Sequence, residues 1–332
     1  MNNNFWTEFK QPIFALAPME DVTDTSFRQI VAEIAKPDYL HVLMTEFVNT
    51  DGLLHEVGRD IVAQRLVVNE SERNLLKEKD IKLVAQIWGK NPDHFYKATK
   101  WICENYDFDG IDINFGCPVK NVVKQGACSA LIDKPELARD IVIATKEASN
   151  IPVSVKTRTG VKQHDTERWI TQLLETKPAA LTLHGRTQKM QSDYPADWNQ
   201  IKLAAEVKNA ILPEIPLLGN GDVFSHQNVK DDLELSNADG VMIGRGIFEN
   251  PWFFNPDIID PDPETRLSLL WRQAILFLDT WKDTKNFAVL RRFFKIYVYN
   301  FEGAARLRAK LMTVKDIDSV YDLLKENPHF KG

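Results

Sequence analysis

Apolar positions recur along the first three-quarters of the chain as short continuous runs, separated by longer stretches of mixed polarity. The runs are rich in aliphatic residues, and turns of Gly, Pro, Asn or charged residues follow them. Near-continuous apolar strands that alternate with helical stretches indicate a parallel sheet covered on both faces. The predicted strands lie at 13–19, 40–47, 83–89, 110–116, 153–160, 180–187, 216–222 and 240–246.

Eight strand–helix units in about 250 residues are typical of an α/β fold, the closed (β/α)8 or TIM barrel, which we predict for residues 1–250. A doubly wound open sheet is the alternative. It is disfavoured because no Gly-x-Gly-x-x-Gly turn follows an early strand. In a barrel the carboxyl ends of all strands meet on one face, so the reactive residue types at those ends would form a single site.

The composition changes after Phe248. Residues 251–264 contain four prolines among acidic residues and Asn, which predicts a linker. From 265 to 332 apolar residues recur at spacings of three and four, which predicts a small all-helical C-terminal domain. Its helices are expected from Arg266 onward and over 287–300, 303–312 and 314–326.

The middle of the helical domain alternates basic and aromatic residues. Arg291 and Arg292 precede Phe293 and Phe294, and more Lys, Arg and Tyr residues follow. One interpretation is a basic patch that tracks a phosphate backbone. The other is solvated charge on helices whose aromatic residues form the core.

The overall composition limits the classes of protein and of partner. At 332 residues and 44% hydrophobic, the chain can bury a large core, which excludes disorder. No apolar run approaches the roughly 20 residues that span a bilayer, so no membrane segment is expected. Three cysteines without a pairing pattern indicate a reducing compartment, the cytoplasm. Because the net charge is −6, a surface that binds nucleic acid must be a basic patch confined to one part of the protein. We also expect a monomer without a bound metal.

The segment Asp112-Ile-Asn-Phe-Gly-Cys-Pro118 places a thiol just beyond an apolar strand. Gly116 and Pro118 break the strand and leave Cys117 on a turn that faces a pocket. Residues 119–131 are expected to form a mobile loop before a helix that begins near Pro135. A free cysteine often serves only as a small buried hydrophobe, which is our interpretation of Cys103. Cys128, in the same loop as Cys117, is a secondary candidate for chemistry.

Signature segments stand in order at the predicted strand ends. They are Ala17-Pro18-Met19, Thr45-Glu46-Phe47, Gln86, Asn114-Phe115-Gly116-Cys117-Pro118, Ser154-Val155-Lys156-Thr157-Arg158, Leu183-His184-Gly185-Arg186-Thr187, Gly219-Asn220-Gly221-Asp222 and Met242-Ile243-Gly244-Arg245-Gly246. Together they resemble the bacterial tRNA-dihydrouridine synthases, over nearly the whole chain. The resemblance implies an FMN-containing barrel and a helical domain that holds tRNA. It also implies the NADPH-driven reduction of a D-loop uridine to 5,6-dihydrouridine.

The chemistry of this reaction is consistent with the residues. Reducing the C5–C6 double bond of uracil requires a hydride and a proton, and no side chain donates hydride, so a flavin or nicotinamide is obligatory. The resemblance implies that reduced FMN delivers hydride to C6 while Cys117 protonates C5 from the opposite face. A thiol with an ordinary pKa of about 8.5 is mostly protonated at neutral pH and can still release its proton.

The resemblance also assigns binding residues. Lys156 would lie near the N1/O2 edge of the flavin, and Arg245 would meet the FMN phosphate. The expected FMN-binding residues are Pro18, Met19, Gln86, Lys156, His184, Asn220, Gly221, Asp222, Gly244 and Arg245. The expected substrate-binding residues are Asn114 and Arg158 for the flipped uracil. By their charge, Arg186 at the mouth of the site and Arg291 and Arg292 of the basic stretch are expected to bind the tRNA.

Two rival functions stay open. A flavin-dependent reductase of a free small molecule, such as a dihydropyrimidine, would share the barrel and the phosphate site, but the basic helical domain argues against it. A non-catalytic tRNA-binding scaffold would share the fold, but Cys117 and Lys156 argue against it. No motif in the sequence recognises the ribose that distinguishes NADPH from NADH, and none indicates which uridine is modified. NADPH and the D-loop are therefore implied only by the resemblance.

Overall fold

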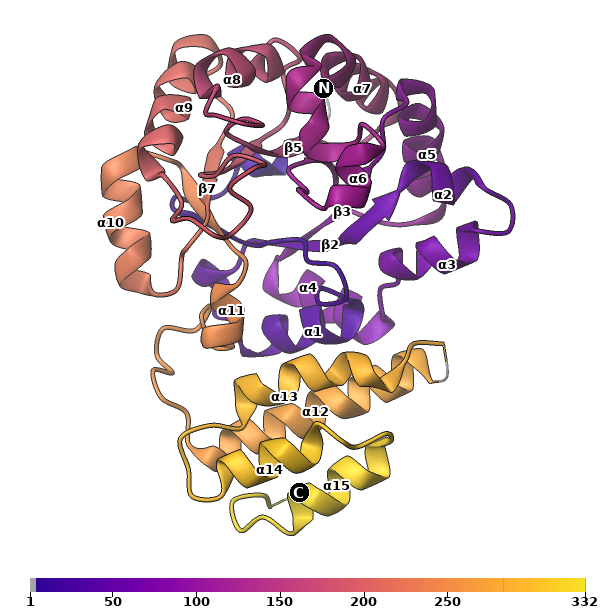
Figure 1. Ribbon diagram of the computed structural model, residues 1–332, viewed down its shortest axis with the longest axis vertical. Helices are drawn as coiled ribbons and strands as arrows, with labels where there is room; N and C mark the ends of the chain where they lie inside the picture. Colours follow the sequence, from indigo (N-terminus) through magenta and orange to yellow (C-terminus); the bar gives the residue numbers. More distant parts are fainter. Residues whose placement is uncertain (1–3, 283, 332) are drawn as a thin grey trace.

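A computed structural model describes residues 4–282 and 284–331 (Figure 1). Within them, parallel strands close into a barrel in the sequential order β1 to β8, with β8 pairing β1. This confirms the predicted TIM barrel, and the open sheet is wrong. The strands are β1 (Ile13–Leu16), β2 (Val42–Asn49), β3 (Lys82–Trp88), β4 (Gly110–Phe115), β5 (Val153–Arg158), β6 (Leu181–His184), β7 (Leu217–Asn220) and β8 (Gly240–Ile243).

Helices surround the barrel and bury their apolar faces against it (Figure 1). The longer ones are α1 (Thr25–Ile34), α4 (Glu70–Lys79), α5 (Pro92–Asn105), α7 (Pro135–Ala148), α8 (Thr166–Leu174), α9 (Trp198–Ile211) and α10 (His226–Ser236). Their starts follow from the sequence: Pro92 and Pro135 begin α5 and α7, and the Asp24 carboxylate accepts a hydrogen bond from the Phe27 amide at the start of α1. Short helices lie in the loops: α2 (Thr50–Leu54), α3 (Arg59–Ala63), α6 (Lys120–Lys124) and α11 (Gly246–Glu249).

The barrel interior is closed at the amino ends of the strands. The 3-10 helix η1 (Phe5–Thr7) places Phe5 and Trp6 against interior residues such as Val42, Met44 and Leu218, in a cluster separate from the larger core between sheet and helices. Burial of these aromatic side chains fills this end with apolar atoms. Polar side chains are therefore concentrated at the opposite, carboxyl end of the barrel.

The segment expected to be a mobile loop, 119–131, is instead folded. It contains α6 and the start of the 3-10 helix η4 (Cys128–Asp133). Cys128, Leu131 and Ile132 are buried, and the Ser129 amide and hydroxyl both donate to the Cys117 carbonyl, at 3.4 and 2.7 Å. Apolar anchors every few residues explain why this polar-looking stretch does not form an open loop. Cys103 is half-buried on α5.

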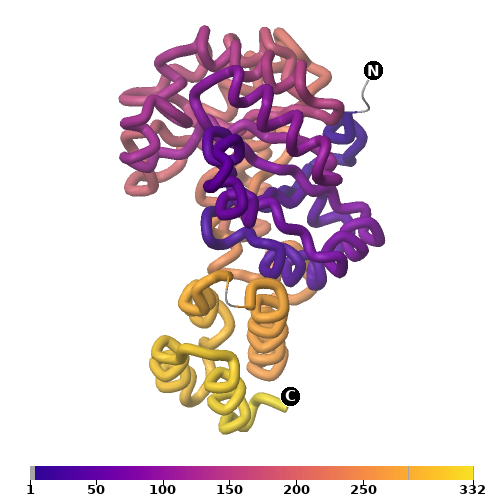
Figure 2. The backbone as a smooth tube through the Cα atoms, turned by 90° about the vertical axis from the view of Figure 1, so that its right-hand side faces the viewer, coloured from indigo at the N-terminus to yellow at the C-terminus, as the bar shows by residue number. Residues whose placement is uncertain are grey.

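The C-terminal residues form helices below the barrel (Figures 1 and 2). They are α12 (Pro263–Trp281), the 3-10 helix η5 (Phe287–Leu290), α13 (Arg291–Tyr297), α14 (Ala304–Leu311) and α15 (Ile317–Lys325). This confirms the predicted helical pattern, with shorter helices than expected. Phe293, Phe294 and Tyr297 are buried, so these aromatic residues form the core of the helices, as in the second interpretation of the basic stretch. No helix in the described ranges is both long and apolar enough to cross a membrane.

The first part of the predicted linker is packed on the barrel. Trp252, Phe253 and Phe254 are buried, and the Phe254 carbonyl accepts a hydrogen bond of 2.9 Å from the Lys36 amide. The Asn255 side chain donates to the Ile34 carbonyl at the end of α1. The chain between barrel and helices therefore leaves the barrel only after residue 255.

A buried cluster, which we call the domain latch, joins the helical domain to the barrel. Trp281, at the end of α12, donates from Nε1 to the Asp24 carboxylate at 2.7 Å. Lys285 lies 3.9 Å from the centre of the Trp281 ring and is 3.1 Å from the Glu46 carboxylate and 3.4 Å from Asp24. Because Asp24 and Glu46 belong to the barrel, these ion pairs, together with the cation–π contact of Lys285, hold the helical domain against the barrel.

Candidate active site

A cavity of about 200 Å³ opens at the carboxyl ends of the strands. Every predicted FMN-binding residue except Gln86 lines it, and so does Arg186. The sequence did not point to Ser192, Val223 or Phe224, which also line it. The residues come from the ends of β1, β5, β6, β7 and β8, which the closed barrel brings together.

Basic groups dominate one end of the cavity. The Asp222 carboxylate accepts hydrogen bonds from Arg186 Nη2, at 2.6 and 2.5 Å, and from Arg245 Nη2 at 2.8 Å. Burial opposes ionisation of Asp222, but the bonds from Arg186 and the Ala196 amide outweigh it and hold the pKa of Asp222 below its usual value. Two guanidinium groups share one carboxylate, so this end keeps an excess positive charge that suits an anionic group such as a phosphate.

Lys156 extends the positive charge toward the barrel centre. Its Nζ donates to Asn220 Oδ1 at 2.9 Å, and Asn220 Nδ2 donates in turn to the Met242 carbonyl at 2.7 Å. Burial, with the nearby Arg158 charge, lowers the pKa of Lys156 to about 8. At neutral pH the ammonium group is mostly protonated, and N–H groups that Asn220 does not use are available to an oxygen of a ligand.

His184 is held as a neutral donor. Arg186 Nη1 lies 3.0 Å from His184 Nε2, and since a guanidinium group only donates, Nε2 must accept and the ring proton must be on Nδ1. Burial, followed by the charges of Arg158 and Lys156, keeps the pKa of His184 well below its usual value. Gly221 is required beside the ring because its φ is +119° and a Cβ would lie 2.9 Å from His184 Cδ2.

The Cys117 turn is braced by two residues expected to bind uracil. Asn114 Oδ1 accepts hydrogen bonds from the Gly116 and Cys117 amides, both at 2.9 Å. Arg158 Nε donates to the Gly116 carbonyl at 2.7 Å, and its Nη1 donates to the carbonyls of Thr187 and Gln191. Both acceptor positions of Asn114 Oδ1 are therefore used to hold the Cys117 turn, whereas Arg158 gives it one bond and directs Nη1 to the loop after β6.

A buried hydrogen-bond chain supports this turn from inside the barrel. Asn114 Nδ2 donates to Gln86 Oε1 at 2.8 Å, Gln86 Nε2 donates to Asp112 at 2.7 Å, and Ser154 also donates to Asp112 at 2.6 Å. Burial raises the pKa of Asp112 to about 6. Gln86 is fully buried and lies outside the cavity lining. Asp112 was not among the predicted site residues, although it alternates with Asn114 on the inner face of β4.

The Cys117 thiol has an unusual environment. It is half-buried at the turn after β4. The neighbouring Cys128 thiol is the largest effect that lowers the pKa of Cys117, to about 7, with smaller contributions from the Val119 amide and the Arg158 charge. A thiol with this pKa exchanges protons readily near neutral pH.

The predicted tRNA-binding arginines lie in three different settings. Arg186 is in the cavity wall, with its guanidinium group bound to Asp222 and its Nε donating to the Tyr194 carbonyl. Arg291 is half-buried and donates to the Val314 carbonyl at 2.7 Å within the helical domain. Arg292 lies at the junction of helical domain and barrel, 3.4 Å from the Asp21 carboxylate.

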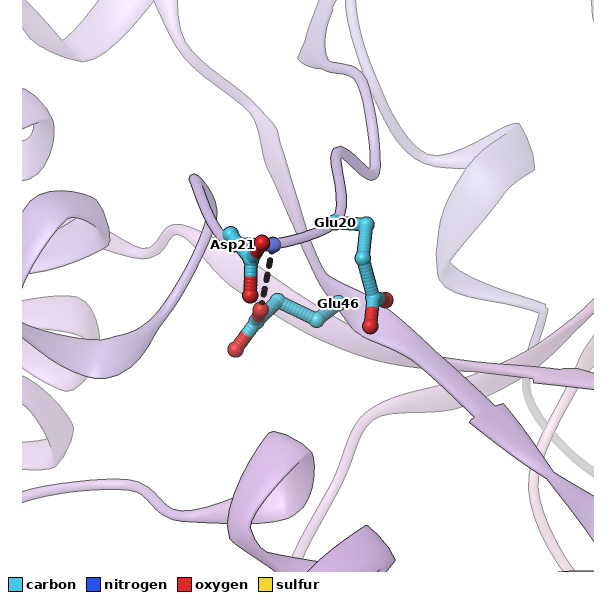
Figure 3. A group of neighbouring side chains, drawn as sticks. All are labelled: Glu20, Asp21 and Glu46. Atoms are coloured by element: carbon cyan, nitrogen blue, oxygen red, sulfur yellow. Dashed lines mark hydrogen bonds between the residues drawn. The ribbon is translucent and has the colours of Figure 1, made fainter. Parts of the chain in front are cut away.

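Three carboxylates gather near the ends of β1 and β2 (Figure 3). Glu20, Asp21 and Glu46 have oxygens within 4.8 Å of one another, and Glu46 accepts a hydrogen bond from the Asp21 amide. Each carboxylate is paired with a cation, Arg65 with Glu20, Arg292 with Asp21 and Lys285 with Glu46, and Lys285 also pairs with Asp24. The group is an ion-pair cluster between barrel and helical domain.

Comparison with known proteins identifies the family. Residues 15–330 match the family model for dihydrouridine synthase (Dus). The chain is 41% identical over 328 residues to a probable tRNA-dihydrouridine synthase of Staphylococcus aureus (strain COL), covering 98% of this chain and 96% of the relative. It is 39% identical over 328 residues to probable tRNA-dihydrouridine synthase 2 of Bacillus subtilis (strain 168), covering 98% and 97%.

A solved structure agrees in fold. Morphinone reductase superposes with a TM-score of 0.51 at 11% identity, covering 76% of this chain and 88% of that chain. At this identity the similarity shows only the shared barrel. The match of the family model over nearly the whole chain, together with the two relatives, leads to one conclusion: the chain belongs to the dihydrouridine synthase family.

Proposed function

We propose that this protein is a cytoplasmic tRNA-dihydrouridine synthase that reduces the C5–C6 double bond of a D-loop uridine, with FMN as cofactor and NADPH as reductant. The observation that carries the proposal is the Cys117 thiol, which stands at the end of β4 with a lowered pKa, on the same barrel face as the cationic cavity. The family match and the names of the relatives support this reaction class. The three free cysteines are consistent with a reducing compartment.

The cavity residues fit FMN by their chemistry. Arg245 and Arg186 supply positive charge for a phosphate, and Gly244 opens the wall, since a Cβ there would meet only Ala17 Cβ, at 3.7 Å. Lys156 would face a ring oxygen, and His184 would donate from Nδ1. A bound flavin would supply the hydride that no side chain can donate, and NADPH is the proposed source of its electrons.

Cys117 supplies the other half of the reduction. As C6 gains a hydride, C5 takes the proton from the Cys117 S–H, and the sulfur becomes a thiolate. The Val119 amide and the Arg158 charge stabilise the thiolate where it forms. Asn114 and Arg158 hold the turn so that the sulfur does not move away from the reacting carbon.

The first test is direct. The purified protein, FMN and NADPH are incubated with tRNA from a strain that lacks dihydrouridine, and the tRNA is mapped by mass spectrometry. We expect one D-loop uridine to gain the mass of two hydrogen atoms. If no uridine gains this mass while NADPH still reduces the flavin, the small-molecule reductase becomes the better assignment, and free uracil and orotate are the substrates to test.

Arg245→Met is expected to weaken FMN binding about 10- to 100-fold, because a charge-assisted contact contributes about 1.5–3 kcal/mol. The variant should lose its flavin on gel filtration, with the dissociation constant measured by fluorescence titration. Lys189→Met, on an exposed position of the loop after β6, is the control and should keep its flavin. Equal flavin affinity in Arg245→Met and the unchanged protein would mean that Arg245 does not bind the FMN phosphate.

Arg292→Ala is expected to weaken tRNA binding a few-fold and to reduce the salt dependence of binding by about one counterion, without loss of flavin. Its side chain is 38% exposed beside the barrel rim. Arg139→Ala is a matched control, since this arginine is 37% exposed in an ion pair on α7, on the far side of the barrel from the helical domain (Figure 1). Equal losses in both variants would indicate a general charge effect and not a binding contact.

A further inference from the structure

The loop between β1 and α1, residues 17–24, forms one wall of the cofactor cavity, which Pro18 and Met19 line. The loop folds into a tight turn, in which the Met19 carbonyl accepts a hydrogen bond of 3.0 Å from the Thr23 amide. Inside this turn Asp21 has a φ of +54°, in the left-handed region that is uncommon for residues other than glycine. A backbone conformation of this kind persists only where surrounding groups hold it.

Two buried carboxylates hold the β1–α1 loop. Glu46 Oε1 accepts a hydrogen bond of 2.7 Å from the Asp21 amide, which Figure 3 shows as a dashed line. The Asp24 carboxylate, at the end of the loop, accepts a hydrogen bond from the Phe27 amide and so joins the loop to α1. Glu46 and Asp24 are both buried. Burial raises the pKa of Glu46, so its charged form depends on a nearby cation.

The helical domain supplies such a cation. Lys285 Nζ lies 3.1 Å from Glu46 Oε2 and 3.4 Å from Asp24 Oδ2, and its charge opposes the effect of burial on the pKa of Glu46. Trp281 Nε1 donates to the same Asp24 oxygen at 2.7 Å. One oxygen of Glu46 therefore binds the β1–α1 loop while the other faces Lys285, so a single carboxylate connects the cavity wall with the helical domain.

Two arginines also pair with the loop, but at its exposed side. Arg65 pairs with Glu20, whose side chain is 35% exposed, and Arg292 pairs with Asp21, whose side chain is 53% exposed. Ion pairs at such positions contribute little. The buried contacts of Lys285 are therefore the ones on which the shape of the loop depends most.

We propose that Lys285 is a positioning residue for the cofactor: from the helical domain, it holds the β1–α1 loop in the shape that forms the cavity wall. The proposal rests on the proposed function in naming FMN as the cofactor. Because coupling between two sites is reciprocal, FMN binding and the docking of the helical domain on the barrel favour each other.

Three variants test this role. Lys285→Met removes the charge and keeps a long side chain. Trp281→Phe removes only the hydrogen bond to Asp24 and keeps a ring beside Lys285, so it decides the test if Lys285→Met does not fold. Arg272→Met is the matched control, because it removes another ion pair between α12 and α1, with Glu33, at the end of α1 that is away from the loop.

The first measurement is hydrogen–deuterium exchange of peptides that cover residues 17–24, in protein without flavin. We expect exchange to be about 10-fold faster in Lys285→Met, within the range typical of coupled sites. In Trp281→Phe it should be about 3-fold faster, as the loss of one hydrogen bond predicts. Arg272→Met should match the unchanged protein. Peptides of α7 (Pro135–Ala148) are the internal reference, since global unfolding would speed their exchange as well.

The second measurement is the dissociation constant of FMN, by fluorescence titration. We expect it to rise about 10-fold in Lys285→Met and about 3-fold in Trp281→Phe, in parallel with the exchange of the loop. In Arg272→Met it should stay within about 2-fold of the unchanged protein, because that ion pair is exposed. None of the three side chains lines the cavity, so a change in FMN affinity would report the position of the loop.

Unchanged exchange of residues 17–24 in Lys285→Met and Trp281→Phe would overturn the proposal. So would faster exchange of the loop with unchanged FMN affinity, or an equal increase in the exchange of α7. Weaker FMN binding in Lys285→Met, in a protein that reduces no tRNA, would uphold the proposal and refute the proposed function. Unchanged FMN binding in a variant of a protein that does reduce tRNA would do the reverse, so the two failures are distinguishable.

Discussion

Cys117→Ala should fold, bind FMN and accept electrons from NADPH, yet reduce tRNA at least ~100-fold more slowly than the unchanged protein. General acid catalysis typically contributes this factor, which corresponds to about 2.7 kcal/mol of transition-state stabilisation. The structure supports a specific loss, because the turn is held by backbone atoms of Gly116 and Cys117 that the substitution leaves in place. Stopped-flow absorbance measures the two half-reactions separately.

The expected pattern is a normal rate of flavin reduction by NADPH and a slow rate of flavin reoxidation by tRNA. Cys103→Ala, with the same chemical change on α5, should show both rates unchanged. If Cys117→Ala reoxidises its flavin with tRNA at the full rate, another group supplies the proton and Cys117 has no part in the mechanism.

Lys285→Met should loosen the helical domain from the barrel at a cost of about 3 kcal/mol in the free energy of unfolding. Lys285 is 14% exposed and faces Glu46 and Asp24, which are 2% and 6% exposed. Removing one partner of a buried ion pair leaves the other charges uncompensated, which typically costs 3–5 kcal/mol. We take the lower end of ~3 kcal/mol because Asp24 keeps donors from Trp281, Ser26 and Phe27.

Guanidinium unfolding, together with limited proteolysis between 255 and 290, measures this effect. Arg272→Met removes another ion pair between α12 and α1, but Arg272 is 47% exposed, so it should cost less than about 1 kcal/mol. The difference between the two variants isolates the contribution of burial. Equal unfolding midpoints would mean that apolar packing, and not the domain latch, holds the helices in place.

The barrel was predictable because its signal is local and repeated. Each strand buries both faces, so each appears as an apolar run, and eight such runs define the fold. The predicted strands extend beyond the observed carboxyl ends. For example, the strand predicted at 180–187 is observed at Leu181–His184. The residues that follow each strand are site residues, and because some of them are apolar they resemble a continuation of the strand. Most residues of the cavity lining followed from the same strand ends.

The contacts inside the site were not predictable from local patterns. Asp222 lines the cavity as expected of a cofactor-binding residue, and its bridge between two arginines that follow different strands was not predicted. Asn114 and Arg158 are still expected to read uracil, and the bonds by which they also brace the Cys117 turn were not predicted. Such pairings depend on side-chain direction between elements. The Lys285–Glu46 pair joins residues 239 positions apart, which no pattern in the sequence signals.

The sequential order of the strands sets a length requirement on whatever binds. With β8 closing on β1, the ends of β4 and β8 lie opposite each other across the mouth. Cys117 follows β4 and Arg245 follows β8. A ligand anchored by its anionic end at Arg245 must therefore reach across the barrel, alone or stacked against its reaction partner, before the thiol can act on it. A compact anion that binds at Arg245 would be too short to reach the thiol, however tightly the arginines hold it.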